Sequence, residues 1–266
     1  MRGGCLRVRE IMDGKHPFIY DDELATKARA IIRDFALRIL PVVKENKKFV
    51  GIVSRGNVMT ISSSISPIRV KGIMTTPKHI AAVEDDAAST VKRMIRLDEW
   101  YVPVVKSAQD KTYQGTLGLE NFINASLKGN LSKLSKQVSE IMSRNVVTCS
   151  PDDEVDNVWR LMQNQSFAGL PVIKRNKLVG IVTQKDLLES GAILPTFESR
   201  KGRFKASTKI SSIMRTTVIA VKPSAEVSEV AKLMISKNIG RIPVKDDKGK
   251  LIGIVDREDV AKILAK

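Results

Sequence analysis

Apolar and polar positions follow the same order in four successive stretches of the chain, each about 55 to 60 residues long. In each stretch a short run of β-branched residues predicts a strand. Apolar residues then recur at helical spacing and predict an amphipathic helix. Two further apolar runs, joined by a polar turn as in LPVIKRNKLVGIV (170–182), predict a hairpin that leads into a second helix. The residues with helical spacing in the third and fourth stretches are Val155, Val158, Trp159, Met162, Val227, Val230, Ala231 and Met234.

Landmark residues keep the four copies in register. An Ile-Met pair opens each copy, a Pro follows 29 residues after the Met, and a Gly precedes an Asn or Asp by six residues. The predicted fold class is α/β (α+β), with four β-α-β-β-α copies. The prolines are Pro41, Pro103, Pro171 and Pro243, and the residues six positions after the Gly are Asn57, Asn121, Asp186 and Asp259. The predicted boundaries are 1–64 for copy one, 65–127 for copy two, 138–194 for copy three and 210–266 for copy four, with basic linkers at 128–137 and 195–209.

The Ile-Met start, the apolar-Pro-Val strand and the ending GIVTQKD (180–186) resemble the cystathionine β-synthase (CBS) domain family. The chain is similar to stand-alone prokaryotic and archaeal proteins with four tandem CBS domains arranged as two Bateman modules. This resemblance implies that adjacent copies pack about a pseudo-twofold axis. It also implies that the clefts between them hold adenosine-containing ligands: AMP, ADP, ATP or S-adenosyl compounds.

Thr183 and Asp186, at the start of the last predicted helix of copy three, have two interpretations. The first is a capping box, in which the hydroxyl accepts a hydrogen bond from an amide of the first turn and the carboxylate reaches back. The second is nucleotide binding, because a helix N-terminus attracts phosphate and a carboxylate accepts hydrogen bonds from both hydroxyls of a ribose. The resemblance to nucleotide-binding CBS domains favours the second role for this pair.

The other copies depart from the Thr and Asp pair. Copy four keeps an acid at Asp259 but has Asp256 in place of the hydroxyl, and the resemblance implies a phosphate contact by Arg241 there. Copies one and two have Asn at the position of the acid, and Asn forms a weaker hydrogen bond to a ribose than a charged carboxylate does. We therefore expect nucleotide chiefly in the C-terminal module, copies three and four. The candidates in copies one and two are Ser54, Asn57 and Asn121.

By family position, the adenine ring is expected beside main-chain groups near the first strand. The residues at those positions are Val146 and Val147 in copy three and Thr217 and Val218 in copy four. Residues of this kind in a short strand are also ordinary core, and that interpretation stays open.

The chain is strongly basic, with 45 Lys and Arg against 29 Asp and Glu and a formal charge of +16. Such an excess attracts polyanions, including DNA and RNA. The linker 195–209 mixes cations with two Phe residues, which suits a phosphate backbone with stacking bases. A solvated loop with Phe197 and Phe204 packed onto the domain is the preferred interpretation of this segment. Nucleic-acid binding, modulated by nucleotide, is therefore the alternative function. The candidate cations are Arg200, Lys201, Arg203 and Lys205.

Several classes of function lack a motif in the sequence. There is no GxxxxGK[ST] loop, no HExxH and no plausible nucleophile and base pair, so we expect no enzyme. Two Cys and two His are too few for a metal site, and they favour a reducing cytoplasm. No apolar run is long enough for a membrane span, and the N-terminus lacks the apolar region of a secretory signal.

The leading hypothesis is a cytoplasmic regulatory or sensor protein without an obligatory cofactor. It would bind an adenosine-containing effector and signal to an unidentified protein partner. Two modules can stack within one chain or pair in a homodimer, and the repeat permits both. A scaffold with empty clefts is a third hypothesis.

Overall fold

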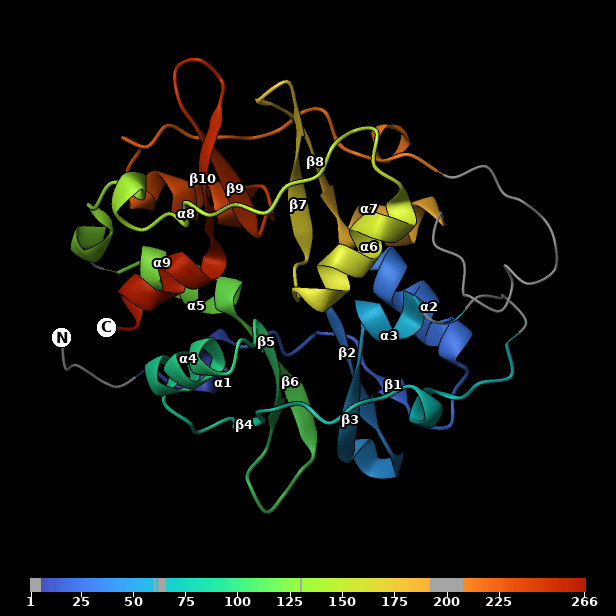
Figure 1. Ribbon diagram of the computed structural model, residues 1–266. Helices are drawn as coiled ribbons and strands as arrows, with labels where there is room; N and C mark the ends of the chain where they lie inside the picture. Colours follow the sequence, from blue (N-terminus) through green and yellow to red (C-terminus); the bar gives the residue numbers. More distant parts are fainter. Residues whose placement is uncertain (1–5, 60, 62–65, 130, 192–207) are drawn as a thin grey trace, which may run out of the picture.

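The computed structural model describes residues 6–59, 61, 66–129, 131–191 and 208–266 (Figure 1). It confirms the α/β (α+β) fold, because every copy contains a hairpin flanked in sequence by two helices. Copy one comprises β1 (Ile19–Tyr20), α2 (Ala25–Asp34), β2 (Ile39–Val43), β3 (Phe49–Ser54) and α3 (Arg55–Met59). Copy two comprises β4 (Ala81–Ala82), α4 (Ala87–Arg96), β5 (Tyr101–Val105), β6 (Tyr113–Gly118) and α5 (Leu119–Leu127).

Copies three and four repeat these helices and hairpins. The predicted first strand shrinks in them to one parallel bridge, Cys149 to Val172 and Val221 to Val244. Copy three comprises α6 (Val155–Asn164), β7 (Gly169–Lys174), β8 (Lys177–Thr183) and α7 (Gln184–Ser190). Copy four comprises α8 (Val227–Ser236), β9 (Arg241–Lys245), β10 (Leu251–Asp256) and α9 (Arg257–Leu264). The other elements are α1 (Val8–Ile11) and the 3₁₀ turns η1 (Glu45–Lys47), η2 (Val70–Gly72), η3 (Leu131–Leu134), η4 (Val138–Glu140) and η6 (Ile210–Ser212).

The apolar face predicted for the first helix of each C-terminal copy is confirmed. α6 and α8 bury the positions that recur at helical spacing. Burying these side chains is the main driving force that holds each helix on its hairpin. The buried residues are Val155, Val158, Trp159 and Met162 in α6 and Val227, Val230, Ala231 and Met234 in α8.

All four hairpins have the same register. The landmark proline always lies opposite the residue that follows the landmark glycine. The sequence landmarks are therefore the points at which the two strands meet. The opposed pairs are Pro41 and Ile52, Pro103 and Thr116, Pro171 and Ile181, and Pro243 and Ile254.

A leader, the segment from the Ile-Met pair to the first strand, crosses from each copy to its neighbour. The leaders are 11–18, 73–80, 141–148 and 213–220. Each exchange is reciprocal, so copies one and two form one module and copies three and four form the other. The bridges that each leader makes are Asp13 to Thr116, Thr75 to Ile52, Ser143 to Ile254, and Arg215 to Ile181.

The two modules stack within one chain, and Figure 1 shows them as the lower and upper halves of the molecule. α5 of copy two packs against α8 and α9 of copy four, while α2 and α3 of copy one pack against α7 of copy three. Leu119 and Val260 belong to one shared apolar cluster, and Ile32 and Leu187 belong to another. The four copies thus enclose a common centre. No helix in the described part of the chain is long and apolar enough to span a membrane.

Candidate functional site

The start of α7 contains the capping box that one interpretation of Thr183 and Asp186 predicted. The Thr183 N–H and hydroxyl donate to Asp186 Oδ2 at 2.9 and 2.5 Å, and the Asp186 N–H donates to Thr183 Oγ1 at 3.3 Å. The Asp186 side chain is 5% exposed. The capping role is confirmed, and it uses one of the two carboxylate oxygens.

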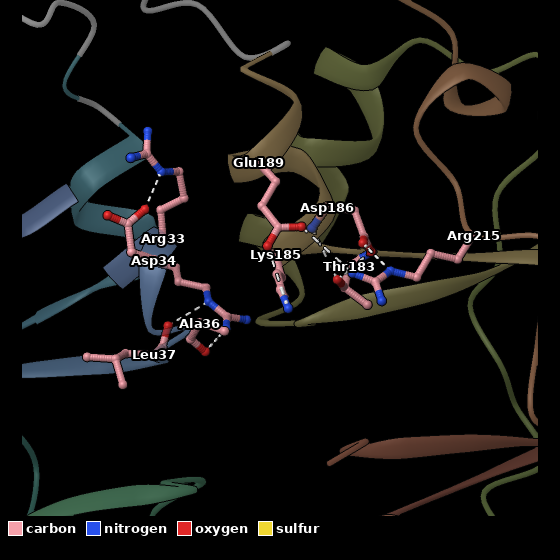
Figure 2. A network of polar contacts seen from close by, with 10 residues as sticks. Arg33, Asp34, Ala36, Leu37, Thr183, Lys185, Asp186, Glu189 and Arg215 are labelled. Carbon is pink, nitrogen blue, oxygen red and sulfur yellow. Dashed lines mark hydrogen bonds and ion pairs between the residues drawn. The ribbon is translucent and has the colours of Figure 1, made fainter. Parts of the chain in front are cut away.

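The second oxygen of Asp186 is held by Arg215, which the sequence analysis did not select. Arg215 Nε donates to Asp186 Oδ1 at 2.6 Å, and its Nη2 lies 3.7 Å from Glu189 Oε2. Figure 2 shows Arg215 reaching from the leader of copy four to the two acids of α7. The hydrogen bond and charge of Asp186 raise the pKa of Arg215. Arg215 thus occupies one acceptor position of the oxygen that the helix cap leaves open.

The start of α9 is organised in the same way but carries two acids. Asp256 Oδ1 accepts the N–H groups of Glu258 and Asp259 at 2.9 and 3.2 Å, and the Asp256 N–H donates to Asp259 Oδ2 at 3.0 Å. Burial and the neighbouring Asp256 raise the pKa of Asp259 to about 7. The raised pKa leaves Asp259 partly protonated at neutral pH.

The copies of the N-terminal module keep the backbone contact without a carboxylate. The Ser54 N–H and hydroxyl donate to Asn57 Oδ1 at 2.8 and 2.7 Å. In copy two the Gly118 N–H donates to Asn121 Oδ1 at 2.7 Å. All four helix starts are thus capped alike, and charge is what separates the C-terminal module from the N-terminal one.

A cavity of about 390 Å³ opens where the four copies meet. Arg38 lies 4.6 Å above the ring of Trp100, and Arg241 lies 5.6 Å from the same ring. Arg241 also donates to the Gly169 carbonyl at 2.6 Å. Burial and Arg38 lower the pKa of Arg241 to about 10, so the Arg241 guanidinium remains charged at neutral pH. Two adjacent cations in a recess make an anion-binding position.

The predicted residues stand at different distances from this cavity. Arg241 and Asp256 belong to its wall, as partners in one β9 and β10 pair. Among the described residues, the wall includes Gln184 but neither Thr183 nor Asp186. The capped start of α7 therefore adjoins the cavity through Gln184, the residue that follows Thr183.

The residues predicted for the adenine position belong to the exchanged leaders. Val147 and Thr217 are exposed, and Val146 and Val218 are partly buried. Since the leader of copy four bridges β8 and that of copy three bridges β10, each helix start faces the leader of the other copy. A site built here draws on both copies of the module.

The four cations proposed for polyanion binding lie outside the described residues. They are Arg200, Lys201, Arg203 and Lys205. Their role in nucleic-acid binding stays a sequence prediction.

Aligning the four copies position by position shows what the sequence analysis missed. Three residues before the landmark proline, two copies have large side chains and two have small ones. The residues at this position are Arg38, Trp100, Ala168 and Gly240. The large side chains occupy the space beside the glycine: a Cβ atom on Gly240 would lie 2.6 Å from Arg38 Nη2 and 3.1 Å from the Trp100 ring.

The position immediately after the Ile-Met pair also differs between copies. Its residues are Asp13, Thr75, Ser143 and Arg215, so only the fourth copy has a cation there.

Comparison with known proteins agrees with this geometry. The family model of the CBS domain matches residues 8–64, 138–192 and 210–266, more than half of the chain. The chain belongs to the CBS domain family. Copy two of this CBS-domain protein lies outside the matched segments, although its strands and helices follow the same order as in copy one.

Full-length relatives share the whole arrangement. Protein MJ1225 of Methanocaldococcus jannaschii is 24% identical over 282 residues, which cover 98% of this chain and 99% of the relative. Its crystal structure, described as that of a candidate archaeal homologue of γ-AMPK, aligns with a TM-score of 0.83 at 21% identity, covering 97% of this chain and 99% of that one. An uncharacterised conserved protein of Pyrococcus horikoshii aligns with a TM-score of 0.67 at 23% identity, covering 97% and 100%. At these identities the likeness shows the fold.

One enzyme matches over part of its length. The inosine-5′-monophosphate dehydrogenase of Korarchaeum cryptofilum is 35% identical over 133 residues, which cover 49% of this chain and 25% of the enzyme. The chain thus spans a quarter of that relative, and the match is confined to the CBS region. No enzymatic activity follows from it.

Proposed function

We propose that this CBS-domain protein is a non-enzymatic regulatory sensor of adenosine-containing ligands. The ligand is AMP, ADP, ATP or an S-adenosyl compound, bound chiefly between copies three and four. The observation that carries the proposal is made at the starts of α7 and α9, which hold Asp186 and Asp259. The strand before each helix pairs with the leader of the other copy, and the central cavity with Arg38 and Arg241 lies near by.

The ribose position follows from hydrogen-bonding chemistry. A carboxylate accepts two hydroxyl donors, so a cis-diol is a good partner for Asp186 or Asp259. The free N–H groups and positive dipole end of a helix favour an anion near by. Arg38 and Arg241 add two full charges at the centre, where a phosphate would lie.

The adenine ring would lie against the leaders. Val146 and Val147 on one side and Thr217 and Val218 on the other offer apolar surface and main-chain polar groups in segments without regular strand pairing. Such backbone can bond the edge of a base, because its own N–H and C=O groups are not used in a ladder.

Signalling follows from the shared centre. All four copies line the central cavity, so a ligand there contacts both modules. A ligand that prefers one packing of the modules shifts the population towards it, and a protein partner can read the change. We propose that the partner is a protein whose activity this chain regulates, and that the two meet without binding a membrane.

Isothermal calorimetry with AMP, ATP and S-adenosylmethionine tests the function. We expect at least one to bind, and Asp186→Asn to weaken binding about tenfold, which corresponds to one charge-assisted hydrogen bond. Asn keeps an acceptor for the Thr183 N–H, so the helix cap survives.

The matched control is Asp152→Asn, an exposed aspartate of the same copy. Its affinity should equal that of the wild type. Absence of heat with all three ligands contradicts the proposed function, and equal affinities of Asp186→Asn and Asp152→Asn contradict the role of Asp186.

A further inference from the structure

Arg215 stands where a ribose would bind in copy three, and this has a consequence for ligand choice. We propose that Arg215 makes this site selective for anionic adenosine ligands, accepting a nucleotide with a 5′-phosphate and rejecting the cationic S-adenosyl sulfonium. The inference rests on the proposed function and concerns which ligand the same site takes.

The carboxylate of Asp186 has no spare oxygen. Thr183 donates twice to Oδ2, at 2.9 and 2.5 Å, and the Arg215 Nε donates to Oδ1 at 2.6 Å. The Oδ2 bonds belong to the helix cap, so they persist when a ligand binds. We therefore assign the diol to Oδ1, the oxygen outside the cap, where it competes with the Arg215 N–H.

Arg215 is able to leave this position. Its side chain is 54% exposed, whereas that of Asp186 is 5% exposed. Glu189 offers a second acid at 3.7 Å, but that acid is itself shared with Lys185 at 3.5 Å. A guanidinium released from Asp186 thus remains beside the ligand and needs an anion.

The charge of the ligand then decides the balance. A 5′-phosphate accepts bidentate hydrogen bonds from the released guanidinium and restores the charge pairing that the diol disrupted. A neutral adenosine compound restores nothing, and a sulfonium adds repulsion between two cations. The affinity order expected for this site is AMP, then 5′-methylthioadenosine, then S-adenosylmethionine.

The other three helix starts lack this feature. The leader residue that corresponds to Arg215 is Ser143 opposite Asp259, Thr75 opposite Asn57 and Asp13 opposite Asn121. None of these is a cation. A leader cation beside the ribose position is therefore particular to the copy three site.

The test compares ligand ratios in the full chain. Calorimetry measures AMP, 5′-methylthioadenosine and S-adenosylmethionine against the wild type and Arg215→Ala. We expect Arg215→Ala to weaken AMP about tenfold and to strengthen S-adenosylmethionine about tenfold, because each effect is one charge interaction. Repeating the titrations in the Asp259→Asn background removes the carboxylate of the copy four site and weakens that site, so that the copy three site contributes more of the measured heat.

Two further variants separate charge from structure. Arg215→Lys keeps the cation and should keep the preference for AMP. Arg160→Ala removes one exposed cation from α6 of the same copy and should leave every ratio as in the wild type. Thermal unfolding of each variant shows that the half-exposed Arg215 can be replaced without loss of the fold.

The outcomes distinguish the two proposals. A ratio of AMP to S-adenosylmethionine affinity that falls in Arg215→Ala and is kept in Arg215→Lys supports the inference. Ligands that bind with the same ratio in Arg215→Ala as in Arg160→Ala overturn it and leave the proposed function standing. Failure of all three ligands to bind any variant overturns both.

Discussion

Asp186 and Asp259 occupy the same position in copies three and four, yet the side chains around them differ. Asp186 has Arg215 on its free oxygen and Thr183 at the cap. Asp259 has a second acid, Asp256, at its cap, and its pKa is raised to about 7. An aspartate in an unfolded chain has a pKa of about 3.9, so folding makes Asp259 hold its proton more tightly.

The pH dependence of stability should reveal this difference. A folded pKa above the unfolded one contributes stability that is complete below about pH 4 and is lost as pH rises through about 7. Asp259→Asn removes the penalty of ionising beside Asp256. We expect thermal unfolding to give the variant a higher free energy of unfolding than the wild type at pH 8, by at least about 1 kcal/mol, with a smaller excess at pH 5 and none below about pH 4.

The control for this experiment is Asp152→Asn, which removes an exposed acid. Its difference from the wild type should be the same at pH 5 and pH 8. A difference for Asp259→Asn that is equally independent of pH would contradict the raised pKa.

At the scale of elements, the helix between the first strand and the hairpin of every copy is followed, two residues after its end, by a residue in the left-handed conformation that is not glycine. This turn redirects the chain from the helix into the hairpin that borders the cavity. A side chain in this region costs stability, and an alanine gains no side-chain hydrogen bond in return. The residues and their φ angles are Ala36 (53°), Asp98 (55°), Ser166 (56°) and Asn238 (48°).

Replacing Ala36 by Gly should therefore stabilise the protein. We expect Ala36→Gly to raise the free energy of unfolding by about 0.5 to 1 kcal/mol, because the strain removed exceeds the entropy added to the unfolded chain. The Ala36 carbonyl, which accepts a hydrogen bond from Arg55, is unchanged by the substitution.

The same substitution inside α2 gives the opposite sign. Ala30→Gly places glycine in an ordinary helical conformation and should lower the free energy of unfolding by about 1 kcal/mol. Urea denaturation measures both. If both variants lose stability, the strain at Ala36 is too small to matter.

At the scale of the whole molecule, one buried arginine joins the two modules. Arg257 at the start of α9 donates to Tyr101 Oη and Glu120 Oε2 of copy two, both at 3.1 Å, and to Asn238 Oδ1 of its own copy at 3.0 Å. Its side chain is 3% exposed. The equivalent Arg55 at the start of α3 donates instead within its own copy, to the Leu37 carbonyl just after α2, at 2.7 Å.

Removing the acid of this contact should weaken the stacking of the modules. Glu120→Ala leaves the charge of Arg257 buried without its carboxylate, and we expect the free energy of unfolding to fall by about 3 kcal/mol. The pair of Glu23 and Lys27 is the comparison: its cation is 56% exposed whereas Arg257 is 3% exposed, so Glu23→Ala should cost less than about 1 kcal/mol. Denaturation curves that shift equally for both variants would show that Arg257 does not hold the modules together.

The repeat unit, its register and its helix caps were predictable from the sequence. They depend on neighbours within one copy: helical spacing in α6, a turn between two strands, and a Thr or Asp three residues before its partner. Such short-range patterns specify local structure directly. The predicted first strand was too long in copies three and four, because its early residues leave to cross the neighbouring copy.

Only the tertiary structure decided which copies meet and what each carboxylate faces. The sequence permitted modules stacked in one chain or across two, and the packing of α5 on α9 places them in one. Arg215 lies 29 positions from Asp186 and contacts it only because the leaders are exchanged. Arg38 and Trp100 fill the space left by Gly240 because three copies converge there. The sequence by itself determined the repeat unit and its helix caps, because the hydrophobic period and the residue spacing act within one copy. Charge pairing between copies depends on where the copies lie relative to one another, and no local pattern encodes that placement.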